Sequence, residues 1–195
     1  MSMLSKDFYE RDPALVAQDL LGKILVRKIN SEILSGKIVE TEAYYGEDDP
    51  ASKAYKGRKM FNELMFTDVG KAFIYMVHGN WLLNIVAHLK GSVGAVLIRA
   101  IQPMKGIENM QKNRNMKDTC DLTSGPGKLT KALAITNDLN GIDVKRKNSQ
   151  LMIVEGKSES LQISSSRRIG VKADLPQKLR FFVKGNKFVS YNGEI

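Results

Sequence analysis

Short segments rich in β-branched and apolar residues recur along the chain, and they constrain its fold more than any other feature of the sequence. Glycine, proline, asparagine or serine residues bound most of these segments, as is typical of strands in an antiparallel sheet. The turn formers of residues 30–35 predict a hairpin between the first two strands, and Pro103 is expected to end the fifth. The expected strands are residues 23–29, 36–44, 72–77, 82–88, 95–101, 151–155, 161–165 and 179–183.

A few short helices are expected beside these strands. The first spans residues 14–21, with Asp12 as its N-cap, Pro13 in its first turn and Gly22 directly after its last residue. No linker or repeat divides the sequence, so we expect a single α+β domain in which strands predominate. The other expected helices are residues 107–115 and 129–133.

The chain is strongly basic. Its 195 residues include 30 lysines and arginines against 21 aspartates and glutamates, which gives a net charge of +9 at pH 7. A positive charge of this size raises the local concentration of polyanions, of which nucleic acid is the first to consider. Because a basic surface also serves solubility alone, charge by itself leaves the partner open.

The cysteine and histidine content limits the chemistry that the chain can support. Cys120 is the only cysteine, so an intramolecular disulfide is excluded. The two histidines lie in other parts of the sequence, so no metal site is expected. No apolar run approaches the ~18 residues that a membrane span needs, and the first residues are charged and contain no apolar stretch, so no signal peptide is expected. We therefore expect an intracellular protein that does not enter a membrane.

Two stretches do not follow the strand pattern. Residues 45–70 are irregular, and so long a loop within a compact domain is more often functional than idle. Residues 125–128, Gly-Pro-Gly-Lys, resemble a phosphate cradle, because backbone N–H groups at a helix N-terminus attract anions and Lys128 adds charge. Their spacing is not that of a Walker loop. The basic runs at residues 145–147 and 167–168 are expected to be solvated.

Two carboxylates and an aromatic ring alternate in the second expected strand. Since side chains alternate along a strand, Glu40, Glu42 and Tyr44 should point to one face, and Val39 and the other residues between them to the opposite face. A solvent-exposed polar face would have the same pattern. The position of the strand at the entrance to the long loop is also compatible with a functional site.

Polar side chains in otherwise apolar strands require partners. Arg99 has only apolar neighbours in residues 95–101, so its guanidinium should meet a carboxylate, a phosphate or water, with a structural salt bridge as the simpler alternative. Asn84 raises the same question in the preceding strand. Tyr75 could be an ordinary core residue, whereas His78 directly follows its strand, where a turn can project a side chain outwards.

Taken together, several blocks of the sequence resemble the alkyladenine, or 3-methyladenine, DNA glycosylase family. They occur in the family's order from about residue 13 to residue 191. Each block alone is weakly specific, but the ordered set is specific. The blocks are residues 18–23 (QDLLGK), 39–44 (VETEAY), 73–75 (FIY) with 78–79 (HG), 97–103 (LIRAIQP), 125–129 (GPGKL), 168–171 (RIGV) and 179–183 (LRFFV).

The resemblance implies one compact α+β domain over residues 1–195, with a curved, mostly antiparallel sheet flanked by helices. It also implies a monomeric base-excision repair enzyme without metal or cofactor. Such an enzyme flips a damaged purine out of double-stranded DNA and hydrolyses the bond between base and sugar, leaving an abasic site. The expected lesions are 3-methyladenine, 7-methylguanine, hypoxanthine and ethenoadenine.

The resemblance also implies roles for single residues. Glu42 matches the glutamate that activates the attacking water, and Arg99 matches an arginine that positions both. Tyr44 and Tyr75 match the aromatic residues that hold the flipped base. Asn84 matches an asparagine whose amide excludes guanine. Phosphate contacts are expected from the basic side chains of Lys56, Arg58, Lys59, Lys128 and Lys131.

Two positions depart from the family's pattern. Lys53 stands where a histidine usually contacts the base, and His78 stands where a tyrosine usually fills the gap left by the flipped nucleotide. The stretch after Gly79 is one residue shorter than usual, so Asn80 or Trp81 could share this wedge role. These departures bear on the preferred lesion more than on the type of reaction.

Two other functions fit parts of the same pattern. One is a non-catalytic binder of damaged DNA or structured RNA, with the same basic face and an inert pocket. The other is an RNA-binding accessory domain like those of formyltransferase-like enzymes, which would have no need of Glu42. Release of free base from methylated duplex DNA separates an enzyme from both.

Overall fold

The longest strand, β2 (Glu32–Tyr44), organises the sheet because it has neighbours along both edges. In this computed structural model, which describes residues 2–190, β5 (Ala95–Lys105) pairs with one edge of β2. Along the other edge, β1 (Ile24–Ile29) pairs with the first half of β2, and β8 (Arg180–Val183) pairs with residues 40–42. These pairings are all antiparallel.

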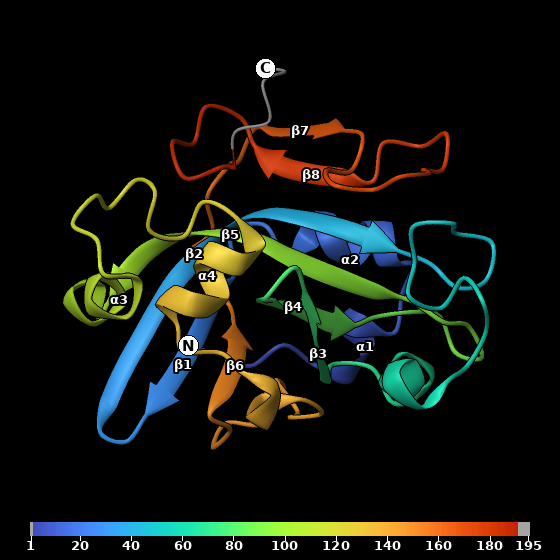
Figure 1. The fold of residues 1–195 in the computed structure, drawn as a ribbon, viewed down its shortest axis with the longest axis horizontal. Helices are drawn as coiled ribbons and strands as arrows, with labels where there is room; N and C mark the ends of the chain where they lie inside the picture. The colour runs from blue at the N-terminus through green and yellow to red at the C-terminus, as the bar shows by residue number, and fades with distance from the viewer. Residues whose placement is uncertain (1, 191–195) are drawn as a thin grey trace.

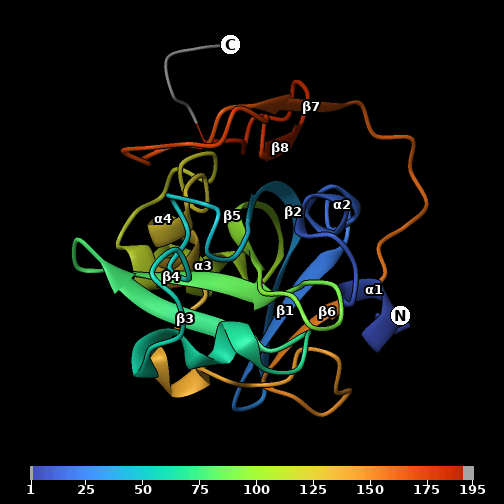
Figure 2. The same ribbon diagram turned by 90° about the vertical axis from the view of Figure 1, so that its right-hand side faces the viewer.

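The remaining strands extend this arrangement to an eight-stranded sheet with the order β3-β4-β5-β2-β1-β6, in which β7 pairs with β8. Figures 1 and 2 show that the sheet curls, with the β7–β8 pair along the top. The expected α+β class, with a curved, mostly antiparallel sheet flanked by helices, is confirmed. The additional strands are β3 (Ala72–Val77), β4 (Asn80–Val86), β6 (Leu151–Val154) and β7 (Ile163–Ser166).

The helices are short, and the second of them begins as the sequence predicts. Asp12 caps α2 (Pro13–Asp19) by accepting hydrogen bonds from the N–H groups of Ala14 and Leu15 at 2.8 and 3.4 Å. None of the helices described in residues 2–190 is long and apolar enough to cross a membrane. The others are α1 (Lys6–Tyr9), α3 (Ile107–Arg114), α4 (Pro126–Ala132) and the 3₁₀ helices η1 (Met60–Phe66) and η2 (Asn137–Leu139).

Some element boundaries differ from the prediction. The first turn is only residues 30–31, because β2 already begins at Glu32. Helix α4 begins at Pro126, so Gly127 and Lys128 lie in its first turn rather than in a loop before it. Proline fits this position because the first N–H groups of a helix have no acceptor within the helix.

The prediction that Pro103 ends β5 is wrong, because the strand continues to Lys105. Strand β4 pairs with β5 only as far as Leu97. Beyond that residue, one edge of β5 no longer has β4 as its neighbour. A residue without a backbone N–H can therefore be placed there without the loss of a ladder hydrogen bond.

A β-bulge at Val39 decides which side chains of β2 face the main core. The register of β2 against β5 shifts there, and Val39 has no partner of its own in the ladder. Ile38 lies in the main core, whereas Val39 packs against Phe188 in a separate cluster. The expectation that Val39 shares a face with Thr41 is therefore wrong, because the inserted residue reverses the alternation.

The β3–β4 hairpin places its tip against the start of α4. His78 and Gly79 form its two-residue turn, with φ angles of 46° and 76° that are typical of a type I′ turn. Gly127 of α4 lies so close that a Cβ added to it would be 2.8 Å from the Cβ of Asn80. The tip projects beyond the rest of the sheet at the left of Figure 2. Close packing against α4 therefore fixes the direction in which the tip projects.

The fully buried carboxylate of Glu40 ties β2 to β5, to β8 and to the chain beyond β8. Its Oε1 accepts hydrogen bonds from Nε of Arg99 and Nε of Arg180, each at 2.8 Å. The backbone N–H of Ser190 donates to Oε2 at 2.7 Å. Burial alone would raise the pKa of Glu40, but the two arginines outweigh burial and lower the pKa below its ordinary value of 4.5. Folding therefore stabilises the ionised form.

Glu40→Gln should lower the free energy of unfolding at neutral pH by about 3 kcal/mol, because Arg180 is then buried without a carboxylate. Since folding lowers the pKa of Glu40, its contribution is present above pH 4.5 and is lost as the pH falls through the folded-state pKa. Urea unfolding at neutral pH and at about pH 3.5 should show that the deficit shrinks in acid.

The matched control is Glu42→Gln, which changes an equally buried carboxylate two residues along the same strand. Folding raises the pKa of Glu42, so the loss of its charge should cost less stability than the loss of Glu40 at neutral pH. Equal losses for the two variants would contradict the structural role given to Glu40.

Candidate active site

The carboxylate of Glu42 is fully buried and is surrounded by polar groups. The Tyr44 hydroxyl donates to Oε2 at 2.8 Å, the N–H of Ile169 donates to Oε1 at 2.7 Å, and Nη1 of Arg99 lies 3.2 Å from Oε1. Burial raises the pKa of Glu42 above its ordinary value of 4.5, although these three neighbours act in the opposite direction. The shift brings the carboxylate closer to the range in which a general base works at neutral pH.

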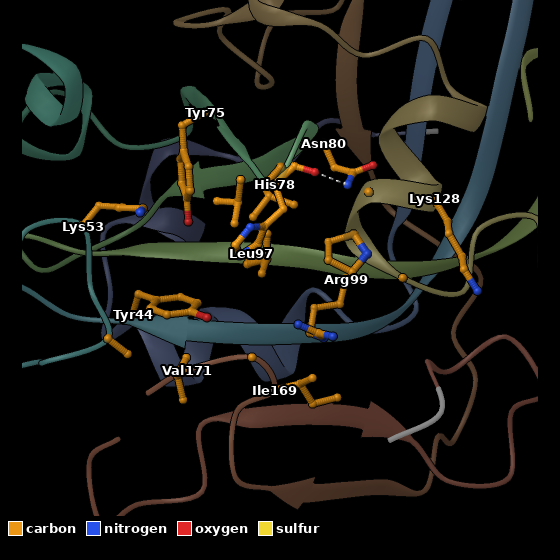
Figure 3. Close-up of a pocket in the computed structure, with 17 residues that line it drawn as sticks. Tyr44, Lys53, Tyr75, His78, Asn80, Leu97, Arg99, Lys128, Ile169 and Val171 are labelled. Carbon is orange, nitrogen blue, oxygen red and sulfur yellow. Dashed lines mark hydrogen bonds between the residues drawn. The ribbon is translucent and has the colours of Figure 1, made fainter. Parts of the chain in front are cut away.

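A cavity of about 670 Å³ opens beside this carboxylate. Tyr44, Arg99 and Ile169 form part of its wall (Figure 3). Glu42 contacts all three and does not itself line the cavity, so its carboxylate lies directly behind the wall. The volume is within the ~300–1,000 Å³ typical of small-molecule sites. A solvent-exposed face for Glu40 and Glu42 is excluded, because both are 0% exposed.

Tyr44 from β2 and Tyr75 from β3 line this cavity from two sides (Figure 3). Burial raises the pKa of Tyr75 to about 12 and that of Tyr44 well above its ordinary value of 10.0, so both hydroxyls are protonated at neutral pH. Tyr75 is an ordinary core residue only in part. Its ring packs 5.0 Å from that of Phe73, between centroids, and also faces the cavity.

Arg168 braces the Tyr44 ring, a contact that the sequence did not reveal. Its guanidinium lies 4.6 Å from the ring centroid and pairs with Asp49 at 2.6 Å and with Asp174 at 2.6 Å. The expectation that residues 167–168 are solvated is therefore wrong for Arg168, because its side chain is 0% exposed. Asp49 precedes Pro50 in the irregular loop, a pattern typical of turns, so no local signal pointed to a buried ion pair.

Lys53 and Asn84 lie near the two tyrosines. The Lys53 ammonium is 5.0 Å from the centroid of the Tyr75 ring and points towards it in Figure 3. Asn84 is buried, and its Nδ2 donates to the backbone oxygen of Phe73 at 3.2 Å. Both residues line a second cavity of about 10 Å³ together with Tyr44 and Tyr75, which is enough room for about one water molecule.

His78 is exposed at the tip of the β3–β4 hairpin and lines the main cavity. Asn80 lines the same cavity, and its Nδ2 donates to the backbone oxygen of His78 at 3.1 Å. Trp81 packs against the main core instead, and its backbone oxygen accepts a hydrogen bond from Thr130 at 2.7 Å. Of the two residues expected to assist His78, the structure brings only Asn80 beside it.

The two main phosphate-binding candidates lie in different places. Lys128 lines the cavity and pairs with Asp121. Arg58 pairs with Glu63 at 2.5 Å, with more than half of each side chain exposed. Each cation therefore has a carboxylate neighbour within the chain. Lys56, Lys59 and Lys131 are exposed.

Other charged groups have structural partners. In the run at residues 145–147, which was expected to be solvated, Lys145 pairs with Asp143 at 2.9 Å and donates to the backbone oxygen of Val69 at 2.6 Å. The Arg146 side chain is 80% exposed, so the expectation is correct for that residue.

Within residues 2–190, no group of three histidine, cysteine, aspartate or glutamate side chains is placed to hold a metal ion.

Comparison with known proteins assigns the chain to one family. Residues 7–187 match a family model described as methylpurine-DNA glycosylase. Three relatives carry the provisional name 3-methyladenine DNA glycosylase. The protein of Carboxydothermus hydrogenoformans is 43% identical over 96% of this chain and 98% of its own length. Those of Clostridium perfringens and Aeropyrum pernix are 42% and 40% identical over 96% of this chain and 98% and 93% of theirs. The chain therefore belongs to the methylpurine-DNA glycosylase family.

Proposed function

We propose that this chain is a monofunctional DNA glycosylase that flips alkylated or deaminated purines out of double-stranded DNA. Its family acts on N-glycosyl bonds as hydrolases, and membership supports the same reaction here. The proposed substrates are 3-methyladenine, 7-methylguanine, hypoxanthine and ethenoadenine. The product is an abasic site, and the enzyme acts as a monomer without a cofactor.

The observation that carries the proposal is the buried Glu42 carboxylate directly behind a cavity lined by two tyrosines. A base must leave the stack before an enzyme can reach its bond to the sugar, and the flipped base then needs a pocket with apolar or aromatic walls. Three donors contact Glu42 among the described residues. A carboxylate offers about four acceptor positions, so one remains for a water molecule.

Glu42 performs the proton transfer in this proposal. Water attacks the anomeric carbon through an oxocarbenium-like transition state, and Glu42 takes the proton that the water loses. The bond from that carbon to the purine nitrogen breaks, and its electron pair leaves with the base. Arg99 restricts the Glu42 carboxylate to one orientation. General-base catalysis of this kind contributes about 10²- to 10⁴-fold to the rate.

Glu40 is the rival base on the same face of β2, and its contacts argue against that role. Its oxygens accept hydrogen bonds from Arg99, Arg180 and Ser190, and its pKa is lowered, so it is the weaker base. Glu42 has a raised pKa and contacts three residues of the cavity wall, Tyr44, Arg99 and Ile169, of which Glu40 contacts only Arg99. Carboxylates whose environments push their pKa values apart are typical of sites in which one acts and one supports.

The tyrosines and the hairpin tip recognise the damaged nucleotide in this proposal. Tyr44 and Tyr75 hold the flipped purine between them, and Asn84 limits the room for an exocyclic amino group. His78 fills the gap in the duplex, with Asn80 beside it. Extrusion of a base costs a few kcal/mol, and less where damage weakens pairing, so weakly paired lesions are flipped more readily.

Glu42→Gln should keep binding of lesion-containing duplex within about twofold and reduce base release by at least ~10²-fold, because the amide cannot take a proton from water. Single-turnover release of free base measures the second effect, and fluorescence anisotropy measures the first. Glu47→Gln, an exposed change in the following loop, is the control and should leave both unchanged. Full release by Glu42→Gln would refute the assignment, and binding without release by the unaltered chain would favour the non-catalytic binder.

Lys128→Ala should weaken binding of damaged and undamaged duplex alike, because a phosphate contact carries no base information. The slope of log affinity against log salt should become shallower by about one unit. Asp121→Asn removes the carboxylate that pairs with Lys128 and should strengthen binding of both duplexes. A Lys128→Ala effect confined to lesion DNA would contradict the phosphate role.

Borohydride should not trap a covalent adduct between the chain and lesion DNA, because plain hydrolysis passes through no Schiff base. The Lys53 amine is the group that could form one near the anomeric carbon. A bifunctional glycosylase treated in parallel provides the positive control. An adduct that forms with the unaltered chain and disappears in Lys53→Met would overturn the monofunctional assignment.

A further inference from the structure

Lys53 occupies the part of the cavity that a flipped base would enter. Its ammonium lies 5.0 Å from the centroid of the Tyr75 ring. Its side chain lines both the main cavity and the small one beside Tyr44 and Asn84. A base that stacks on Tyr75 must therefore displace this ammonium or lie directly against it.

Lys53 differs from the other lysine and arginine side chains that line the main cavity. Arg99 pairs with Glu40 and Glu42, and Lys128 pairs with Asp121. Within residues 2–190, the Lys53 ammonium forms no ion pair and no hydrogen bond, and its side chain is exposed. No carboxylate within these residues pairs with it, so the ammonium is free to act on whatever enters the cavity.

We propose that Lys53 makes this site selective for neutral damaged purines over purines that carry a positive charge. The inference rests on the proposed function, because it assumes that the base binds between Tyr44 and Tyr75. Hypoxanthine and ethenoadenine belong to the favoured class. Purines methylated at N3 or N7 carry a positive charge in the nucleotide and belong to the disfavoured class.

Two effects of one ammonium produce this selectivity. The first is repulsion between the lysine and a cationic base. Two unit charges ~4 Å apart repel enough, even at the dielectric constant of water, to weaken binding about fivefold, and by more where the cavity excludes water. The lysine also occupies the aromatic face of Tyr75 that would otherwise attract a cationic base.

The second effect is proton donation to a neutral base. A methylated, positively charged purine leaves the sugar as a neutral molecule, whereas an uncharged purine leaves as an anion unless it gains a proton. The Lys53 ammonium gives its proton to a ring nitrogen of the purine as the bond to the sugar breaks, and the lysine becomes a neutral amine. Water loses its proton to Glu42 in the same reaction, and solvent later returns a proton to Lys53.

The test compares release of hypoxanthine with release of 7-methylguanine from duplexes of one sequence under single-turnover conditions. Lys53→Met keeps the length of the side chain and removes its charge. It should slow hypoxanthine release about 10²-fold or more, within the range of general-acid catalysis, and should speed 7-methylguanine release severalfold. The ratio of the two rates is the diagnostic quantity, because it cancels any change in folding or in binding of DNA.

Two further variants separate the contributions. Lys53→Arg keeps the positive charge but is a much poorer proton donor, so 7-methylguanine release should remain slow while hypoxanthine release falls. Lys56→Met removes an exposed positive charge from the same loop at a residue that does not line the cavity, and it should change both rates by the same factor.

An unchanged ratio of rates in Lys53→Met would overturn the inference and leave the proposed function intact. An equal effect of Lys53→Met and Lys56→Met would also overturn it, because Lys53 would then act only as a general surface charge. If the unaltered chain released neither base, the proposed function would fail and the inference would fail with it.

Discussion

The guanidinium of Arg99 bridges two buried carboxylates, and much of the structure depends on that bridge. Its Nε lies 2.8 Å from Glu40, and its Nη1 lies 3.2 Å from Glu42. Two buried negative charges and one positive charge would be costly, because each unpaired ion loses several kcal/mol of hydration. Arg180 of β8 supplies the second cation, at 2.8 Å from Glu40. The packing of β8 against β2 thus brings the cation that balances the second carboxylate of the site.

The two carboxylates differ in their environment although they share one face of one strand. The arginines and the main chain at Ser190 enclose Glu40 and lower its pKa, whereas burial dominates at Glu42 and raises its pKa. Glu40 and Glu42 share a face because they are two residues apart on the strand, and the bulge at Val39 lets Ile38 lie in the main core on the opposite face. One carboxylate therefore stabilises the fold, and the other remains available beside the cavity.

A cation lies over each tyrosine of the cavity, with opposite consequences. Arg168 over Tyr44 is buried and held by two aspartates, so that wall of the cavity is fixed. Lys53 over Tyr75 is exposed and has no carboxylate partner within residues 2–190, so it can move when a base enters. In the proposed function, the fixed wall positions a substrate, and the movable cation supplies discrimination by charge.

Local patterns in the sequence determined the strands, the Asp12 cap and the turn at His78, because each depends on residues within a few positions of one another. The order of the resembling blocks also indicated the family and selected Glu42 over Glu40. Only the tertiary structure decided which polar groups meet: the backbone N–H of Ile169 donates to Glu42 across 127 positions of sequence, and Arg168 pairs with Asp49 across 119. Alternation and capping act over a few residues, whereas an ion pair forms wherever folding brings two buried charges together, and no local pattern specifies that meeting.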